Sequence, residues 1–315
     1  MESKQFLTQY IKAEAKRLGF DVCGIAHAEP VAEIISDGYR KWLAQGNEAN
    51  MDYLSRNIEK RLDPTLLVDN VKSIVCVAMN YRPPIFISKD NYQLAWYAYG
   101  KDYHIVMREH LHQLFLSIKT QIPEIEGRYF CDTAPVLERY WAEKAGLGWR
   151  GKNTQLIIPK QGTSFFLGEL FLNIELEYDK PMGNHCGNCN ACQEQCPTHA
   201  LYTDEDTGLH LLNANLCLSY QTIENKKEIN PNLQKAMGLN IYGCDQCQKA
   251  CPHNRLAQPT NHKEFEASEE LLKMTQKDWE SLTLEKYQSL FKNSAVKRAK
   301  LEGLKRNIEA AKNNT

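Results

Sequence analysis

The sequence has no apolar run that approaches the roughly eighteen residues needed by a membrane-spanning helix. It also has no excess of either charge, because 38 lysine and arginine residues against 39 aspartate and glutamate residues leave a formal net charge of −1. A membrane protein is therefore disfavoured, and any contact with a polyanion must come from a local patch. The first ten residues, MESKQFLTQY, lack the apolar segment of a secretion signal, so we expect a cytoplasmic protein.

Cysteine is abundant. The chain has 11 cysteines, and eight of them fall into two blocks. The first block has the spacing C-x-x-C-x-x-C-x-x-x-C-P, and the second has C-x-x-C-x-x-x-C-P with one detached cysteine upstream. The members in chain order are Cys186, Cys189, Cys192 and Cys196, followed by Cys217, Cys244, Cys247 and Cys251. Spacings of this kind are typical of bacterial ferredoxins that hold two iron–sulfur clusters.

In such ferredoxins the last cysteine of a block binds the cluster of the other block. We therefore predict one [4Fe–4S] cluster ligated by Cys186, Cys189, Cys192 and Cys251. The other cluster would be ligated by Cys196, Cys217, Cys244 and Cys247. This assignment leaves no member of the two blocks unused, and it predicts a protein that transfers electrons.

Two other uses of these cysteines fit the spacing less well. Structural zinc sites usually have two C-x-x-C pairs separated by a longer loop, not three cysteines at successive intervals of three. A disulfide framework is disfavoured because cytosolic thiols stay reduced. The remaining cysteines, Cys23, Cys76 and Cys131, lie in apolar strand-like runs and are expected to be small buried hydrophobic residues.

Residues 1–180 alternate helical and strand-like segments, which predicts an α/β domain. Apolar residues at helical spacing predict helices over 6–18 and 103–122, and a further helix with Pro135 near its first turn. Short apolar runs predict strands over 20–25, 71–79, 128–131, 156–158 and 165–174.

Two more regions follow a polar, turn-prone boundary near residues 179–184. Residues 181–258 contain the cysteine blocks and are expected to form a small ferredoxin-like domain. Residues 259–315 are predicted to be a short helical segment, with helices over 266–273, 276–291 and 295–312. Lys292 to Lys312 include seven basic and two acidic residues, which makes a basic patch on a nearly neutral chain.

Residues 146–151, GLGWRG, match the dinucleotide-binding pattern G-x-G-x-x-G letter for letter. That fingerprint requires a strand before the glycines and a helix after them. Here the preceding segment is helical and the following one is strand-like, so no dinucleotide site is predicted. Gly146 is interpreted as a helix C-cap, and Gly148 and Gly151 as a loop that lets a ligand approach the backbone.

Several segments together resemble the epoxyqueuosine reductase family. They are EKR at 59–61, GKDYH at 100–104, DTAPVLERYWAEKAGLGWRGKNTQLIIP at 132–159, CLSY at 217–220, YGCDQCQ at 242–248 and SAVKR…GLKRN at 294–307. The cysteine blocks alone are shared with many ferredoxin-like proteins, whereas AGLGWRGKN is much more specific. The resemblance covers nearly the whole chain.

The resemblance implies a cobalamin-binding α/β domain, two [4Fe–4S] clusters and a tRNA substrate. The implied reaction removes the epoxide oxygen of epoxyqueuosine at the wobble position, consumes two electrons and two protons, and releases water. The clusters pass single electrons and the cobalt corrin collects two, while the protein orients the cofactor and supplies protons. An external low-potential donor of the flavodoxin or ferredoxin type is also implied, and we expect a monomer without membrane contact.

The proton donor of the family corresponds to Asp132, at the end of a predicted strand. An aspartate with its ordinary pKa near 4 is ionised at neutral pH, so this role requires burial beside corrin and substrate to raise the pKa. Alternatively, Asp132 only caps the helix that follows it, as aspartate often does. The residues alone leave both alternatives open, and the resemblance favours the catalytic role.

The same resemblance implies corrin contacts from Arg61, Asp132, Asn153, Leu156, Leu167 and Ser219. Without it, Leu156 and Leu167 would be interpreted as strand core. His104 begins a predicted helix, where histidine is more often a capping or surface residue. The family binds cobalamin without a protein histidine below the cobalt, so His104 is not assigned as a metal ligand.

Arg298, Lys305 and Arg306 correspond to positions that lead into the tRNA-contacting helices of the family, although a solvated helix face is the simpler alternative. Two other functions compete with epoxide reduction. A plain electron carrier would not need a domain as large as residues 1–180. A reductive dehalogenase usually carries a twin-arginine export signal, which the first ten residues lack.

Overall fold

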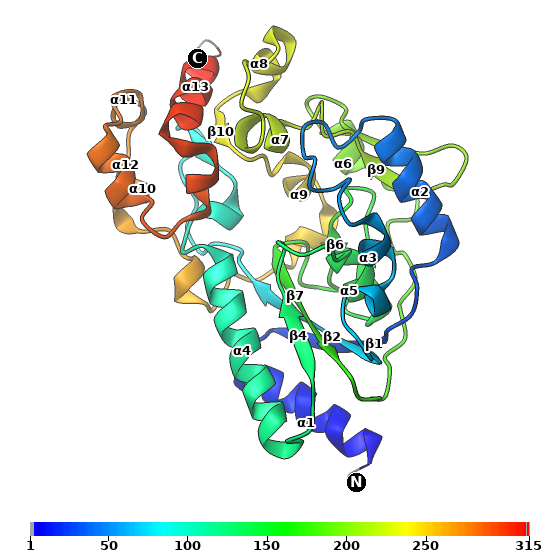
Figure 1. The fold of residues 1–315 in the computed structure, drawn as a ribbon. Helices are drawn as coiled ribbons and strands as arrows, with labels where there is room; N and C mark the ends of the chain where they lie inside the picture. Colours follow the sequence, from blue (N-terminus) through cyan, green and yellow to red (C-terminus); the bar gives the residue numbers. More distant parts are fainter. Residues whose placement is uncertain (1–2, 313, 315) are drawn as a thin grey trace.

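A four-stranded sheet organises the N-terminal half of the computed structural model, which describes residues 3–312 and 314 (Figure 1). Its strands lie in the order β1 (Val22–His27), β2 (Ser73–Asn80), β7 (Phe165–Leu172) and β4 (Gly127–Phe130), and all neighbours are antiparallel. The strand predictions are confirmed within a few residues. The alternation of helices and strands nevertheless does not build the parallel sheet of α/β proteins, because β1 pairs antiparallel with β2 and β4 pairs antiparallel with β7.

Helices cover both faces of this sheet (Figure 1). One face packs against α1 (Lys4–Arg17) and α4 (Tyr103–Gln121), and the other packs against α5 (Glu138–Lys144). The two central strands are therefore buried at every position, which explains why they are almost continuous apolar runs in the sequence. Full burial of each leucine, isoleucine or valine side chain contributes about 1.5–3 kcal/mol.

Helix α4 begins and ends close to where the sequence predicts. The Asp102 side chain caps it by accepting a 3.0 Å hydrogen bond from the backbone N–H of His104. The predicted apolar face is confirmed, except that Phe115 is only partly buried. Because this cap fixes the first turn, the side chains of Tyr103 and His104 have defined directions at one end of the sheet.

The cysteine blocks lie in a region of short elements. These are α6 (Ala191–Glu194), β8 (Leu201–Thr203), β9 (His210–Leu212), α7 (Leu218–Ile223), α8 (Pro231–Met237), β10 (Asn240–Tyr242) and α9 (Gln246–Lys249). Strand β10 pairs in parallel with β3 (Gln93–Leu94), and the Asp245 carboxylate accepts a 2.8 Å hydrogen bond from the backbone N–H of Trp96. Backbone contacts thus join this region to the N-terminal half, and the predicted division at residues 180 and 258 stays a prediction.

The C-terminal region departs from the prediction at two points. One helix was expected over 276–291, but α11 (Gln276–Glu280) and α12 (Leu284–Leu290) are separate because the Thr283 side chain accepts a hydrogen bond from the N–H of Lys286 and starts a new helix. The helix expected over 295–312 is a 3-10 turn, Ala295–Ala299, followed by α13 (Lys300–Lys312). The left-handed φ of +59° at Lys300 separates these two elements.

The other elements are small. They are α2 (Glu33–Ala44), α3 (Ile58–Leu62), β5 (Trp149–Arg150), β6 (Leu156–Ile157) and α10 (Glu269–Lys273), with 3-10 turns at Pro64–Leu66, Trp96–Ala98, Pro252–Arg255 and Lys263–Phe265. Among residues 3–312 and 314, no helix combines the length and apolar character that crossing a membrane would require.

The glycine-rich loop at residues 146–151 is confirmed as a connection from a helix to strands, since it joins α5 to β5 and β6. Gly146 follows the end of α5 with a φ of +73°, as a C-cap glycine does. A side chain at Gly148 would lie 2.1 Å from the carbonyl oxygen of Ile157. The expected ligand approach is therefore wrong for Gly148, because strand β6 of the chain itself occupies that space.

Asn307 of α13 ties the C-terminal helix to the cysteine region. It is fully buried, and its side-chain amide donates hydrogen bonds of 2.7 and 2.8 Å to the carbonyl oxygens of Thr222 and Ile241.

Asn307→Ala leaves both carbonyls buried without these partners, so we expect a loss of about 2–4 kcal/mol in the free energy of unfolding. Urea unfolding of anaerobically prepared protein measures this loss. Glu309→Ala, at an exposed position of the same helix, is the control, and an equal loss in both variants would refute the assignment.

Candidate active site

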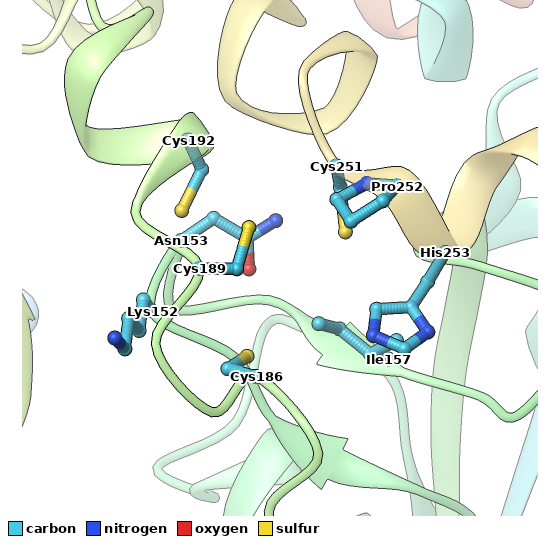
Figure 2. Close-up of a pocket in the computed structure, with 9 residues that line it drawn as sticks. All are labelled: Lys152, Asn153, Ile157, Cys186, Cys189, Cys192, Cys251, Pro252 and His253. Carbon is cyan, nitrogen blue, oxygen red and sulfur yellow. The ribbon is translucent and has the colours of Figure 1, made fainter.

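Four cysteines from both blocks surround one small cavity of about 20 Å³. Figure 2 shows the sulfur atoms of Cys186, Cys189, Cys192 and Cys251 turned toward this shared space. Within the described part of the chain, no three His, Cys, Asp or Glu side chains converge closely enough to hold a single metal ion. The four thiols line one shared space, as the ligands of a cluster of several atoms do.

The other four cysteines line a second cavity of about 420 Å³. They are Cys196, Cys217, Cys244 and Cys247. The two groups are the ones proposed from the sequence, and each contains a member of the opposite block. The structure brings the thiols of each group together, while their role as cluster ligands stays a prediction.

The electrostatics of the thiols follow the same grouping. Burial, together with the neighbouring thiols of Cys217 and Cys196, raises the pKa of Cys244 to about 12. Burial also raises the pKa of Cys192 to about 11, with contributions from Cys251 and Cys186. Buried thiols of this kind stay protonated unless iron binds them as thiolates, so cluster assembly would release protons.

The large cavity lies where the sheet meets the cysteine region. Five of the six residues expected to contact a corrin line it: Asp132, Asn153, Leu156, Leu167 and Ser219. Leu167 comes from β7 and Leu156 from β6, so strand ends form the apolar side of the cavity. The cysteine group around Cys244 lines the same cavity.

Asn153 lies between the two cavities and lines both. It is only 2% exposed, and its amide nitrogen has no hydrogen-bond partner among the described residues. A buried amide donor without a partner is costly, by about 1–3 kcal/mol, unless a ligand accepts its hydrogen bond. The side chain is therefore placed to donate to an acceptor bound in one of these two cavities.

Arg61 is not among the residues that line the large cavity. It is buried in α3, where its Nη2 donates a 3.2 Å hydrogen bond to the carbonyl oxygen of Tyr53 and its guanidinium lies 6.0 Å from the ring of Tyr39. Its Nε atom has no partner within residues 3–312 and 314. These contacts assign Arg61 a place in local packing, and its role as a corrin contact stays a prediction.

Asp132 lies in the loop after β4 with a left-handed φ of +57°. Its carboxylate accepts hydrogen bonds from the Tyr103 hydroxyl and from His104 Nε2, at 3.2 Å, and its backbone N–H donates to the Glu138 carboxylate. The alternative role as a helix cap is wrong, because α5 begins only at Glu138 and residue 137 precedes it as the cap. Pro135 likewise lies before the helix and not in its first turn.

The protein residues by themselves lower the pKa of Asp132, and the rise expected from burial beside corrin and substrate stays a prediction. Partial burial by itself would raise this pKa, but the hydrogen bonds from His104 and Tyr103 together outweigh it. The Asp132 side chain is also 55% exposed, so the protein alone does not exclude water from it. In this state Asp132 is ionised at neutral pH and carries no proton of its own.

Three residues of the site were not predicted from the sequence. Tyr103 and Glu138 both line the large cavity and contact Asp132, although they lie in segments that the family resemblance already included. Glu169 is fully buried in β7, and neither carboxylate oxygen has a hydrogen-bond partner in the described part of the chain. Its signal in the sequence is a single charge within the apolar run FFLGELFL.

The basic residues of the C-terminal patch differ in whether their side chains already form hydrogen bonds within the protein. Arg298 forms hydrogen bonds of 2.9 and 3.0 Å with the Glu224 carboxylate. The Arg306 guanidinium donates to the carbonyl oxygens of Asn225, Gln221 and Lys227. Lys305 is exposed. Contact with tRNA stays a prediction for all three, and the engaged donors of Arg306 weigh against it.

Two family models match the chain. One is described as "Epoxyqueuosine reductase QueG, DUF1730" and matches residues 61–133. The other is described as a "4Fe-4S double cluster binding domain" and matches residues 185–254, which include all eight cysteines of the two groups.

Curated proteins and solved structures give the same result. An epoxyqueuosine reductase of Cellulophaga algicola is 42% identical over 312 residues, which cover 99% of this chain and 100% of that protein. Another, of Leadbetterella byssophila, is 44% identical over 302 residues, which cover 96% and 97%. A crystal structure of epoxyqueuosine reductase with a modified tRNA-Tyr stem loop has a TM-score of 0.87 and 28% identity, covering 99% of this chain and 82% of that one.

The buried Glu169 predicts a measurable pH dependence of stability. Burial raises its pKa well above 4.5, so the folded state keeps a proton that the unfolded state releases as the pH rises. The free energy of unfolding therefore falls between about pH 4.5 and the folded-state pKa. We expect Glu169→Gln to lack this contribution, so that its stability relative to the wild type increases from pH 5 to pH 8 in thermal unfolding.

Glu124→Gln, at an exposed position, is the matched control and should follow the wild-type curve. A difference between Glu169→Gln and the wild type that does not change with pH would show that Glu169 is already ionised in the folded protein.

Proposed function

The chain belongs to the epoxyqueuosine reductase family and is an oxidoreductase, and on that premise we propose that it reduces epoxyqueuosine in tRNA to queuosine. The observation that carries the proposal is the large cavity, which is lined both by Asp132 and Tyr103 and by a group of four cysteines. A proton-handling carboxylate and an electron-transfer site thus face one space. A plain electron carrier would not need such a cavity.

The chain has a double-cluster [4Fe–4S] domain, and we propose which thiols ligate each cluster. Cys186, Cys189, Cys192 and Cys251 would hold the outer cluster, and Cys196, Cys217, Cys244 and Cys247 the inner one. Cys189 is exposed at the surface, whereas the second group opens into the large cavity. This arrangement supports electron entry at the outer cluster, from a flavodoxin- or ferredoxin-like donor, and delivery through the inner one.

The residues around the large cavity fit a corrin. A corrin has a broad apolar ring with amide groups at its rim, and the cavity offers Leu156 and Leu167 for the ring and the unpartnered amide of Asn153 for a rim group. Ser219 adds a hydroxyl beside the inner cysteine group. When bound, a reduced cobalamin would supply the nucleophilic electron pair that opens the epoxide.

The protein residues would orient the substrate and move protons. The overall reaction breaks both C–O bonds of the epoxide, takes up two electrons and two protons, and releases the oxygen as water. Asp132, at the cavity wall, would protonate the leaving oxygen, while Glu138 holds the backbone of its loop and Tyr103 holds its carboxylate. Binding of cofactor and substrate would cover the exposed carboxylate and exclude water from it.

Asp132→Asn tests the proposed function. The variant keeps the size of the side chain and an acceptor for Tyr103 but has no proton to transfer. We expect iron and cobalt contents equal to the wild type, and a single-turnover rate on an epoxyqueuosine-modified stem loop that is lower by about 10²–10⁴-fold. Asp69→Asn, at an exposed position, is the control. Normal turnover by Asp132→Asn with both cofactors present would refute the proton-donor role.

The basic patch on α13 is proposed to contact the tRNA backbone through Lys305. Each phosphate contact that is removed should flatten the salt dependence of affinity by roughly one unit of slope. We expect this change for Lys305→Ala and not for Lys16→Ala, an exposed lysine on α1 at the other end of the molecule (Figure 1). Arg306→Ala should instead lower stability, because three backbone carbonyls lose their donor. An unchanged slope for Lys305→Ala would indicate a solvated helix face.

A further inference from the structure

An ionised Asp132 cannot donate a proton, but two of its hydrogen-bond partners carry one. The Tyr103 hydroxyl and His104 Nε2 both contact the same carboxylate oxygen, Oδ2. Burial, together with the charge of Asp132, raises the pKa of Tyr103 far above its ordinary value of 10, so the phenol keeps its proton. His104 is therefore the neighbour that can donate a proton to Asp132 near neutral pH.

His104 lies between two carboxylates. Its Nδ1 is 2.8 Å from Asp102 Oδ1, and its Nε2 is 3.2 Å from Asp132 Oδ2. Carboxylate oxygens only accept hydrogen bonds, so both contacts are hydrogen bonds only when both ring nitrogens carry a proton. The ring also stacks on Tyr103 with centroids 4.1 Å apart, which holds the Nε2 proton in line with Asp132.

We propose that His104 stores the proton that Asp132 delivers to the substrate, so that the two side chains act as one acid; this rests on the proposed function. The proton passes from His104 Nε2 to Asp132 Oδ2, and from the Asp132 carboxyl to the oxygen that leaves the epoxide carbon. His104 ends as a neutral imidazole that keeps its Nδ1 proton on Asp102, and Asp132 ends ionised. Asp102 is then a positioning residue, because it fixes the ring without touching the substrate.

The charges around His104 favour its protonated form. Burial alone would lower its pKa, but the hydrogen bonds to Asp102 and Asp132 raise it to about 9. His104 is therefore protonated at pH 7, and it loses this proton as the pH rises through about 9. Other titratable or charged groups also interact with His104, Asp102 or Asp132. They are Tyr53, Tyr97, Tyr103, Arg108, Cys131, Glu138, Arg139, Glu169, Tyr242 and Arg298.

These other groups do not replace His104 as the proton store. Burial, together with the charge of Asp132, raises the pKa of Glu138 to about 8, but its Oε1 is occupied by the backbone N–H of Asp132. Arg108 donates a 2.6 Å hydrogen bond to Thr133, and Arg139 donates a 2.9 Å hydrogen bond to the carbonyl of Thr154. Among these described residues, only His104 combines a proton that can be released with a hydrogen bond to the Asp132 carboxylate.

The first test does not depend on turnover. Histidine-selective ¹³C NMR of oxidised, anaerobically purified protein should show one imidazole that titrates near pH 9 and is absent from His104→Gln. Asp102→Asn keeps an oxygen to cap α4 but removes one of the two charges, so the titration should move to lower pH. His112→Gln, at an exposed position of the same helix, should not shift it. Titration of His104 near its ordinary pKa of 6.5 in the wild type would overturn the proposal.

The second test measures single-turnover reduction of a modified stem loop between pH 6 and 10. The wild-type rate should fall above about pH 9, and in Asp102→Asn the fall should begin at lower pH. His104→Gln, with iron and cobalt retained, should be slower by about 10²-fold or more and should lack this fall. His104→Gln with the wild-type rate and pH profile would overturn the proposal. A wild-type protein that leaves epoxyqueuosine unchanged would refute the proposed function instead, while the titration still reports whether the pair exists.

Discussion

The exchange of one cysteine between the two blocks is the constraint on which the rest of the structure depends. Cys251, from the second block, lies with the first block, and Cys196, from the first, lies with the second. This exchange requires α6 and α9 to lie against each other. As a result one group of thiols opens into the large cavity while the other extends to the surface, and a proposed electron path has a defined direction.

The second group of thiols shares its cavity with residues of the N-terminal half. These residues come from β6, β7 and the loop after β4, and the loop holds Asp132 at a φ of +57°. A left-handed conformation of a residue other than glycine costs about 1–3 kcal/mol and persists only where the surroundings impose it. Here the imposing contacts are those of Tyr103, His104 and Glu138, so the strained residue is held by three polar partners.

The sequence predicted elements well where local physics decides them. Apolar periodicity located α4 and the central strands, and cysteine spacing divided the eight thiols into two groups that the structure also brings together. The predictions from the sequence were wrong where a single contact decides the local structure. The helix expected over 276–291 is divided by the hydroxyl of Thr283, and the loop at Gly148 faces strand β6 in place of a ligand.

For the candidate site, the sequence by itself determined which residue types are present and, through family resemblance, that Asp132, Asn153, Leu156, Leu167 and Ser219 belong together. Only the tertiary structure decided their electrostatic state. The proton-donor role requires a raised pKa for Asp132 beside corrin and substrate, whereas the protein residues by themselves lower it, because residues 28 and 29 positions earlier in the chain donate hydrogen bonds to it. Protonation depends on distances of a few ångströms between groups that are far apart in sequence, and such distances exist only after folding.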